Sequence, residues 1–412
     1  MKVIQYMGSK TNLLTNIEAG MKHYFGAEYE KQEFMFDVFS GSGAVANHFK
    51  NQFNMITNDK QAFTKVINDT NLKDRHNVDY LKRLINELNN LPEYYFDKTD
   101  GWFTKTYAQD YNDGSAVGED GVRKVFLTKN GKKLDMIRHR IDELYDNEKI
   151  NFSEKSFLLA CLLSAVDKIT NTLGHQNGYL KNWSKKSLND LTLILPEISM
   201  SNKFSLNLNA DVEFIVPHIK ADIMYIDPPY GKSNGGTGTR YSSFYHLHNT
   251  IVENSRPEIF GKASKPVKTR VSDRFEGTKR NEVMKLMTNL IKNSQCKSFV
   301  ISYSTTGLLT INDFKKVFEL AGCDIDSLQL YTMNHTLNNQ SKAAAKSITE
   351  TQLVGSVTEL LFMVKMENRN LYDEEFILSE IENHLSNSVN SEMCIPNIYS
   401  IDNGICSRIE RD

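Results

Sequence analysis

Residues 33–43 read EFMFDVFSGSG, in which a compact apolar run is followed at once by a turn with two glycines. The next residues, AVANHFK (44–50), are typical of the first turns of a helix, and NMIT (54–57) predicts a second short strand. That strand ends at Asn58-Asp59. The order strand, glycine loop, helix, strand, acid is that of a nucleotide-binding α/β unit. We therefore predict a ligand site at the carboxyl end of the first strand.

The loop Phe39-Ser40-Gly41-Ser42-Gly43 has the composition of a ligand-binding turn. Glycines let the backbone approach a ligand closely, and the helix that follows offers free N–H groups. Asp59 lies 16 residues after Gly43, where an acid accepts hydrogen bonds from ribose hydroxyls. The alternatives are a tight strand-to-helix turn and, for Asp59, a helix N-cap. The loop differs from the GxGxxG dinucleotide fingerprint and lacks the lysine of the GxxxxGK[ST] phosphate loop.

Further along the chain, strand patterns alternate with a long helical stretch. Apolar runs predict strands at 222–226, 297–304 and 359–365, and the periodicity at 311–322 predicts a helix between the last two. From about residue 75 to 200 helical patterns dominate, above all at 132–146 and 153–170. We expect one α/β sheet that is interrupted by a mostly helical insertion.

The composition bounds the class of protein. With 412 residues, 40 % apolar and 24 % charged, the chain has the make-up of an ordinary globular protein of more than one unit. No stretch approaches the roughly 20 apolar residues of a membrane span, and the amino terminus lacks the pattern of a signal peptide. The five scattered cysteines include no CxxC pair, so we predict no metal site and a cytoplasmic location. A net charge of −2 means that any nucleic-acid partner must meet a local basic surface.

Residues 222–230, DIMYIDPPY, end a predicted strand in an unusually stiff turn. Asp227 and Pro228 each precede a proline, which restricts their backbone. The Asp227 carboxylate and a nearby carbonyl thus form two fixed acceptors, which suit an amino group with two N–H donors. An exocyclic amine on a nucleobase is a poor nucleophile, and holding both N–H groups aims its lone pair at an electrophile. Tyr230 offers a ring on which a flipped base stacks; the alternative is a plain surface turn.

These motifs together resemble the adenine-specific DNA methyltransferases of the DNA adenine methylase superfamily, in the subgroup of restriction-modification enzymes. Matching segments run from residue 4 to about residue 365. Asp227-Pro228-Pro229-Tyr230 is similar to the family's catalytic (D/N)PP(Y/F) motif, and 39–43 to its FxGxG motif. Further similar blocks are FLTKNG with Ile137-Arg138, NTLG (171–174) with YLKNW (179–183), and SYSTTGLL (302–309).

The resemblance implies a cofactor, S-adenosyl-L-methionine, and a set of residues for it. It implies catalytic roles for Asp227, Pro228, Pro229 and Tyr230. It implies that the cofactor is bound by Tyr6, Lys10, Asp37, Phe39, Gly41, Gly43, Asp59, Asp211 and Asp227, of which Asp211 has the loosest match. The implied fold is a Rossmann-like methyltransferase sheet, and the implied reaction is methylation of adenine N6 in double-stranded DNA.

The order of the motifs is that of the alpha class, which places target recognition in the insertion before DPPY. We expect residues 1–74 to form the first part of the catalytic domain, 75–200 the helical target-recognition insertion, 201–365 the second part, and 366–412 an extension of unassigned role. Candidate DNA-contacting residues in the insertion are Arg123, Lys124, Lys132, Lys133, Arg138, His139, Arg140, Lys181, Trp183, Lys185 and Lys186. The implied partners are double-stranded DNA and a cognate restriction endonuclease, with the enzyme a monomer or a homodimer and no membrane partner.

Three kinds of alternative remain open on the sequence. The same fold methylates other amino groups, such as cytosine N4, adenine in RNA or glutamine in a protein, although Asp227 favours adenine. A non-catalytic DNA-binding relative is opposed by the presence of Lys10, Asp59 and Asp227. A nicotinamide-dependent oxidoreductase is opposed by the missing GxGxxG pattern.

Overall fold

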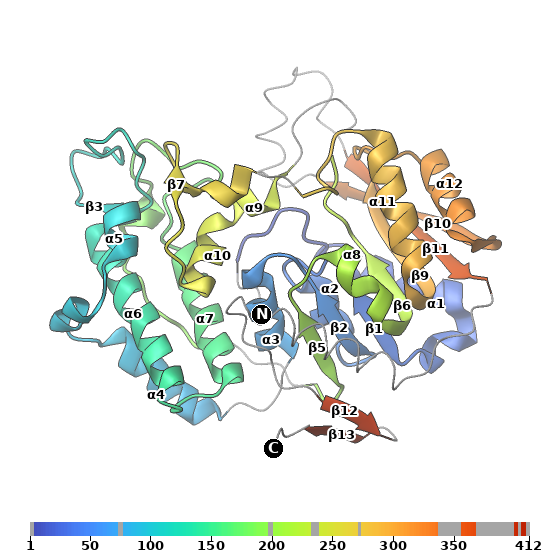
Figure 1. The fold of residues 1–412 in the computed structure, drawn as a ribbon, viewed down its shortest axis with the longest axis horizontal. Coiled ribbons are helices and arrows are strands. Elements are labelled where there is room, and N and C mark those ends of the chain that lie inside the picture. The colour runs from blue at the N-terminus through green and yellow to red at the C-terminus, as the bar shows by residue number, and fades with distance from the viewer. Residues whose placement is uncertain are drawn as a thin grey trace.

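The computed structural model describes residues 4–72, 77–196, 201–231, 239–270, 273–336, 356–367, 399–402 and 405–408. Within these residues the chain forms a seven-stranded sheet, flanking helices and a separate helical layer (Figure 1). No helix in these ranges combines the length and the apolar character that a membrane span requires.

The central sheet has the strand order β10-β11-β9-β6-β1-β2-β5. Neighbours from β9 to β5 run parallel, while β11 is antiparallel to both β9 and β10. The strands are β1 (Phe34–Asp37), β2 (Asn54–Asn58), β5 (Ser205–Leu208), β6 (Lys220–Ile226), β9 (Gln295–Ser304), β10 (Cys323–Thr336) and β11 (Ser356–Met366). Since the chain proceeds from β1 to β2 on one side and returns to β6 on the other, the strand order reverses at β1, where α/β sheets bind ligands.

Helices cover both faces of this sheet, which explains why its strands are apolar on both faces. On one face, Ile17 and Phe49 pack against sheet residues such as Tyr225. On the other, Leu286 and Phe314 pack against Phe299. The first face is covered by α1 (Leu14–Phe25) and α2 (Ala44–Phe49), and the second by α8 (Val212–Ile215), α11 (Arg280–Asn293) and α12 (Ile311–Ala321).

A third apolar core holds the helical layer together, on the left in Figure 1. Its helices are α3 (Ala62–Leu72), α4 (Val78–Asn89), α5 (Trp102–Tyr107), α6 (Thr128–Asp146), α7 (Phe152–Asp167), α9 (Tyr241–Phe244) and α10 (His246–Glu253). Asn151 and Glu154 form a capping box that fixes the start of α7. Tyr245, Leu247 and Ile251 belong to this core, so a segment that follows β6 returns to pack on helices from before it.

Short elements complete the described chain. They are the strand pairs β3 (Ala108–Gln109) with β4 (Phe126–Leu127), β7 (Ile259–Phe260) with β8 (Lys265–Pro266), and β12 (Tyr399–Asp402) with β13 (Ile405–Arg408). The 3₁₀ helices are η1 (Gly26–Lys31), η2 (Glu93–Lys98), η3 (Lys185–Leu188), η4 (Val216–His218) and η5 (Val267–Arg270). Apart from 366–367, β12 and β13, the predicted extension 366–412 lies outside the described residues.

The elements predicted from periodicity are confirmed. The runs at 222–226, 297–304 and 359–365 lie in β6, β9 and β11, and the helical patterns at 132–146 and 153–170 correspond to α6 and α7. Strands β5 and β10 were not predicted. Two of the candidate DNA-contacting residues, Lys124 and Arg138, are 8 % and 3 % exposed, so their side chains point into the protein and cannot reach DNA in this conformation.

Candidate functional site

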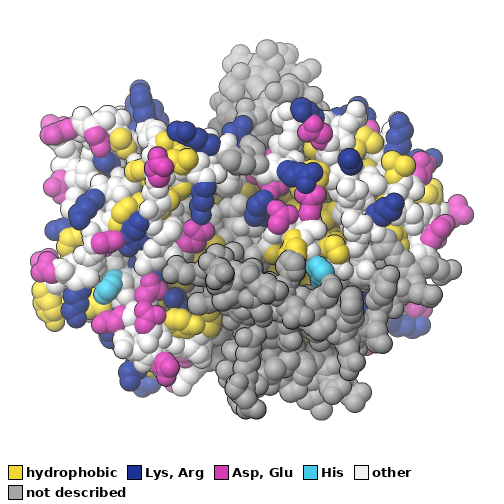
Figure 2. Space-filling view, in the orientation of Figure 1, with side chains coloured by type: hydrophobic (Ala, Val, Ile, Leu, Met, Phe, Trp, Pro, Cys, Tyr) yellow, Lys and Arg dark blue, Asp and Glu magenta, His cyan; other side chains and the backbone are white. Residues whose placement is uncertain are grey.

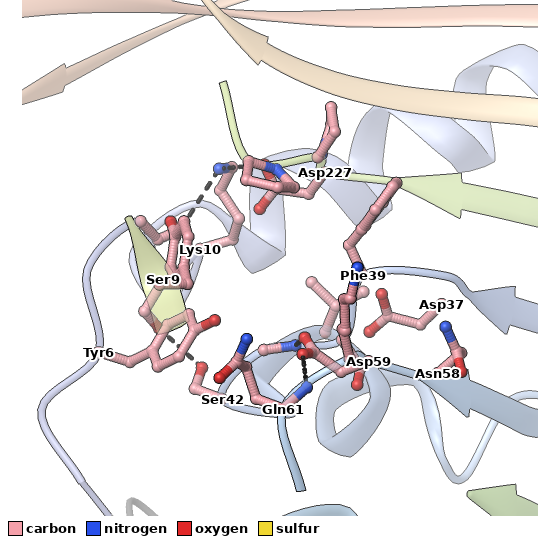
Figure 3. A pocket seen from close by; sticks show the side chains of 18 of the residues that line it. Tyr6, Ser9, Lys10, Asp37, Phe39, Ser42, Asn58, Asp59, Gln61 and Asp227 are labelled. Atoms are coloured by element: carbon pink, nitrogen blue, oxygen red, sulfur yellow. Dashed lines mark hydrogen bonds and ion pairs between the residues drawn. The ribbon is translucent and has the colours of Figure 1, made fainter. Parts of the chain in front are cut away.

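A cavity lies at the carboxyl end of the parallel strands, where the strand order reverses (Figure 3). Its wall is formed by the amino-terminal residues 6–10, the end of β1 with the loop after it, the end of β2, Ala210 with Val212, the turn after β6, Tyr241, and Asp273 with Glu276. These segments are far apart in the sequence and meet only through the sheet order.

The glycine loop passes close to an aromatic ring. Gly41 and Gly43 have φ values of 48° and 71°, in the left-handed region that favours glycine. A Cβ atom on Gly41 would lie 2.7 Å from the ring of Tyr6, well inside contact distance. The amino-terminal segment and the loop are therefore packed against each other, and Ser42 Oγ donates to Ser9 Oγ at 3.4 Å across the same contact.

Asp59 holds this loop in place. Its Oδ2 accepts from the N–H of Gly41 at 2.9 Å, and its Oδ1 accepts from the N–H of Gln61 at 2.9 Å. Burial raises the pKa of Asp59 to about 6 even though both hydrogen bonds favour the charged form. The predicted acid is thus in the cavity wall, where it also shapes the loop.

Asp37, the last residue of β1, carries a buried carboxylate. Its side chain is 1 % exposed, and neither oxygen has a hydrogen bond of ordinary geometry among the described residues. The backbone N–H of Ala46 favours the charged form of the Asp37 carboxylate, but burial outweighs it and raises the pKa of Asp37 well above its ordinary value. Because an unpaired buried carboxylate is costly, this site is suited to a ligand with a positive group.

Tyr6 belongs to a stack of tyrosines that closes one side of the cavity. Its ring lies 4.9 Å from that of Tyr245 and 5.4 Å from that of Tyr241, with interplanar angles of 12° and 29°. The Tyr245 hydroxyl accepts from the N–H of Met7 at 2.8 Å, and the Tyr241 hydroxyl donates to the Met7 carbonyl at 3.2 Å. The helical layer thereby fixes the amino-terminal segment over the cavity.

Asp227 and Lys10 form a partly buried ion pair, with side chains 18 % and 6 % exposed, on the opposite side of the cavity from Asp59 (Figure 3). Lys10 Nζ donates to Asp227 Oδ1 at 2.8 Å and lies 3.3 Å from Glu359 Oε1. Burial raises the pKa of Asp227 to about 6, against the pull of Lys10 and with a further rise from Glu359. Burial alone lowers the pKa of Lys10, but Asp227 and Glu359 outweigh it and hold that pKa well above its usual value.

The rest of the DPPY turn also lines the cavity. Pro228, Pro229 and Tyr230 all contribute to its wall. The Tyr230 ring lies 4.9 Å from the ring of Tyr303, and burial raises the pKa of its hydroxyl to about 12. Tyr230 therefore stays neutral at ordinary pH and presents an aromatic surface.

The structure brings the predicted site residues together, with one exception. Tyr6, Lys10, Asp37, Phe39, Gly41, Asp59, Asp227, Pro228, Pro229 and Tyr230 all line the cavity, and Gly43 lies in the same loop. Asp211 does not: it accepts from the N–H of Glu213 at 3.0 Å as the N-cap of α8. Its flanking residues Ala210 and Val212 contribute to the cavity wall instead.

Several cavity residues were missed by the sequence analysis. Lys60 Nζ lies 3.0 Å from carboxylate oxygens of both Asp211 and Asp273. Glu276 accepts from the N–H of Tyr241 at 2.7 Å, and burial raises the pKa of Glu276 to about 7. Lys60 could have been predicted from the sequence because it directly follows Asp59. No local sequence pattern marks Asp273 or Glu276 as cavity residues.

The charge of the cavity wall favours a cationic ligand. Five carboxylates (Asp37, Asp59, Asp227, Asp273 and Glu276) line it, against the two amines of Lys10 and Lys60. A ligand with a sulfonium group and a neighbouring α-amino group carries positive charge. That charge would be complementary to the acidic wall and to Asp37. Within the described residues no group of three or more His, Cys, Asp or Glu side chains is arranged to bind a metal ion.

Several known methyltransferases align with this protein over most of its length. It is 28 % identical to the type II methyltransferase M.FokI of Planomicrobium okeanokoites over 80 % of this chain and 49 % of that protein. It is 29 % identical to modification methylase LlaI of Lactococcus lactis subsp. lactis over 84 % of this chain and 54 % of that protein. It is 27 % identical to the type II methyltransferase M.NlaIII of Neisseria lactamica over 77 % of this chain and 89 % of that protein.

The chain thus spans about half the length of the first two of these relatives. The sequence profile of one family matches residues 6–319, well over half of the 412 residues. That match includes the glycine loop, Asp59 and the DPPY turn. The chain belongs to the D12 class of N6 adenine-specific DNA methyltransferases.

Proposed function

We propose that this protein transfers a methyl group from S-adenosyl-L-methionine to N6 of an adenine flipped out of double-stranded DNA. The observation that carries the proposal is the partly buried Asp227 carboxylate, which is held by Lys10 at the stiff DPPY turn and faces a cavity rich in carboxylates. Family membership supports the adenine substrate. The names of the relatives support a role as the modification enzyme of a type II restriction-modification system, with a cognate endonuclease as partner.

The cofactor is assigned to the part of the cavity between β1 and β2. When bound, it supplies an electrophilic methyl group on a positively charged sulfur. Asp37 would hold its α-amino group, because this buried carboxylate has no ordinary hydrogen-bond partner among the described residues. Asp59 and the Gly41 loop would hold the ribose, with Phe39 at the side.

The base is assigned to the turn after β6. The Asp227 carboxylate and the Pro228 carbonyl accept the two N–H groups of adenine N6, so that the nitrogen lone pair points into the cavity. Tyr230 stacks on the ring, since its own ring is neutral, only partly buried and part of the cavity wall. A base within a duplex cannot reach this depth, so the nucleotide must leave the helix.

Target recognition is assigned to the helical layer that contains residues 75–200. It adjoins the cavity, because Tyr241 and Tyr245 connect its core to Tyr6. On the face shown in Figure 2, lysine and arginine side chains are intermixed with aspartate and glutamate over both halves of the molecule. Contact with DNA would therefore rest on a local group of basic side chains.

The test is to incubate the protein with labelled S-adenosylmethionine and unmethylated DNA, and to identify the labelled base after digestion. We expect N6-methyladenine; label in N4-methylcytosine, or only in RNA or protein offered in parallel, would contradict the proposal. Asp227→Ala should lower turnover at least about 10²–10³-fold, the scale for loss of one polar group that acts on the transition state. Asp326→Ala is the matched control, because that side chain is exposed on β10, outside the helical layer.

A further inference from the structure

Glu359 is a charged residue at the start of a buried apolar run in β11 (Ser356–Met366). It lies in β11, its side chain is 3 % exposed, and the five residues after it, from Leu360 to Val364, are all apolar and buried. A carboxylate in such a place is costly unless it is paired and hydrogen-bonded. Neither the catalytic turn nor the cofactor loop includes it.

The partners of Glu359 connect it to the catalytic turn. Ser302 Oγ, on the adjacent strand β9, donates to Glu359 Oε1 at 2.8 Å. Lys10 Nζ lies 3.3 Å from the same oxygen and 2.8 Å from Asp227 Oδ1. The Lys10 ammonium, which is itself 5 % exposed, thus stands between the buried carboxylate of Glu359 and the partly buried carboxylate of Asp227.

We propose that Glu359 is a positioning residue for the transfer reaction: it holds Lys10 between the two carboxylates and keeps the group around Asp227 negatively charged. This inference rests on the proposed function and adds a residue to it. Glu359 acts through Lys10 and Asp227 and does not touch the base.

The charge balance gives the reason. Two carboxylates and one ammonium carry a net charge of −1, whereas the Lys10–Asp227 pair alone is neutral. During transfer the N6 lone pair forms the N–C bond while the S–C bond breaks and its electrons stay on sulfur, and N6 then releases one proton to solvent water. Positive charge therefore develops on N6 beside Asp227 before the proton leaves, and a negative group there stabilises it.

Glu359 also limits how strongly Lys10 competes for Asp227. Lys10 Nζ donates to Asp227 and to the Gly8 carbonyl, at 2.8 and 3.3 Å, and Glu359 is its third neighbour. Without the negative charge of Glu359, the ammonium would be drawn to Asp227 alone. The Asp227 carboxylate would then be a weaker acceptor for an amino group.

The other ionisable groups that act on Asp227 come from every element around it. They are Lys10 and Tyr6 of the amino-terminal segment, Asp37 of β1, Tyr225 of β6, Tyr230 of the turn, Tyr241 of α9 and Glu359 of β11. All of these residues except Glu359 line the cavity. Substitution of Glu359 therefore changes the charge near Asp227 and leaves every cavity-lining side chain in place.

The decisive variant is Glu359→Gln, which keeps the size of the side chain and an acceptor for Ser302. We expect kcat for DNA methylation to fall about tenfold while KM for S-adenosylmethionine stays within about twofold, the pattern for an interaction made in the transition state. The acid limb of the pH–kcat profile should move to lower pH, since a nearby negative charge is gone. Glu319→Gln, at an exposed position on α12, is the matched control and should match the wild type. An unchanged kcat and an unchanged acid limb overturn the proposal.

A second measurement needs neither cofactor nor DNA. The titration of Asp227 is followed by carboxyl carbon NMR of Asp-labelled protein, with the signal assigned by its loss in Asp227→Asn. The pKa of Asp227 should fall in Glu359→Gln, and by less in Ser302→Ala, which frees Glu359 to turn away from Lys10. An unchanged pKa in both variants overturns the proposal, and Ser302→Ala carries the test if Glu359→Gln does not fold. Because this readout involves no methylation, it separates a failure of the inference from a failure of the proposed function.

Discussion

Asp227 combines two properties that oppose each other. It lies in a site where burial favours the protonated form, yet the proposed role requires a carboxylate that accepts an N–H group. Lys10 at 2.8 Å resolves most of this conflict, because an adjacent ammonium stabilises the charged form. The result is a carboxyl group with a pKa of about 6, still mostly ionised at neutral pH.

The pH dependence of turnover follows from this value. The pKa of Asp227 is raised from 3.8 to about 6, so the working ionised form is present above pH 6 and is lost as the pH falls through that value. At saturating DNA and cofactor we expect kcat to fall about tenfold per pH unit below about 6. Steady-state rates from pH 5 to 8 check this, with DNA binding followed over the same range as the control. A kcat that stays flat down to pH 5 would contradict it.

At the scale of elements, an arginine of α6 connects that helix to α10, the helix of the same layer that follows the catalytic turn in the sequence. Arg138 of α6 donates from Nε to the Ile251 carbonyl at 2.7 Å and from Nη2 to the Val252 carbonyl at 3.1 Å, and pairs with Asp142 at 2.7 Å. These carbonyls belong to the last turn of α10, where no further helical N–H groups are present to donate to them. The arginine that was a candidate for DNA contact is therefore structural.

Replacing this arginine should destabilise the helical layer. We expect Arg138→Met to lower the free energy of unfolding by about 2–4 kcal/mol, because it removes the hydrogen bonds to two carbonyls and the partly buried ion pair with Asp142. Lys155, 2.8 Å from Asp142, keeps that carboxylate partly paired. Urea unfolding followed by circular dichroism measures the loss. Arg140→Met, on the same helix but at a 27 % exposed side chain, should cost less than about 1 kcal/mol; equal losses would argue against the role of Arg138.

Periodicity was sufficient to predict the elements that are apolar over a full window. The runs that became β1, β6 and β11 contain the continuous apolar stretches FMF, IMYI and LLFMV, because helices cover both faces of the sheet. Strand β5 escaped prediction because its sequence, SLNL, is short and half polar at the edge of the sheet. Strand β10, CDIDSLQLYTMNHT, is mostly polar because it forms the opposite edge.

At the scale of the whole molecule, the cavity exists only when distant segments are assembled. Residues 6–10 are held over it by Tyr241 and Tyr245 of the helical layer, while the turn after β6 and the loop after β1 come from adjacent strands. A ligand that spans these segments binds the folded protein and not the unfolded chain. Its binding must therefore stabilise the whole fold.

Thermal unfolding tests this coupling. With S-adenosylmethionine at 100 times its Kd, we expect a gain of about 2.7 kcal/mol in unfolding free energy and a matching rise in Tm. Asp59→Ala should lose most of this gain at the same concentration, because Asp59 both lines the cavity and holds the Gly41 loop. Asp79→Ala, which changes an exposed residue, should keep it. A Tm that does not respond to the cofactor in the wild type would remove S-adenosylmethionine from the assignment.

The sequence by itself determined five of the seven strands of the central sheet, the glycine loop and the DPPY turn, because apolar runs, glycines and prolines act on their own stretch of backbone. It also pointed to the residues that line the cavity, through motifs that lie at strand ends. Only the tertiary structure decided that Asp211 caps a helix, that Arg138 is buried, and that Glu276 and Glu359 stand beside the site. The physical reason is that a side chain's burial, charge and partners depend on which elements pack around it, and the sheet order brings together residues as distant as Lys10, Asp227 and Glu359.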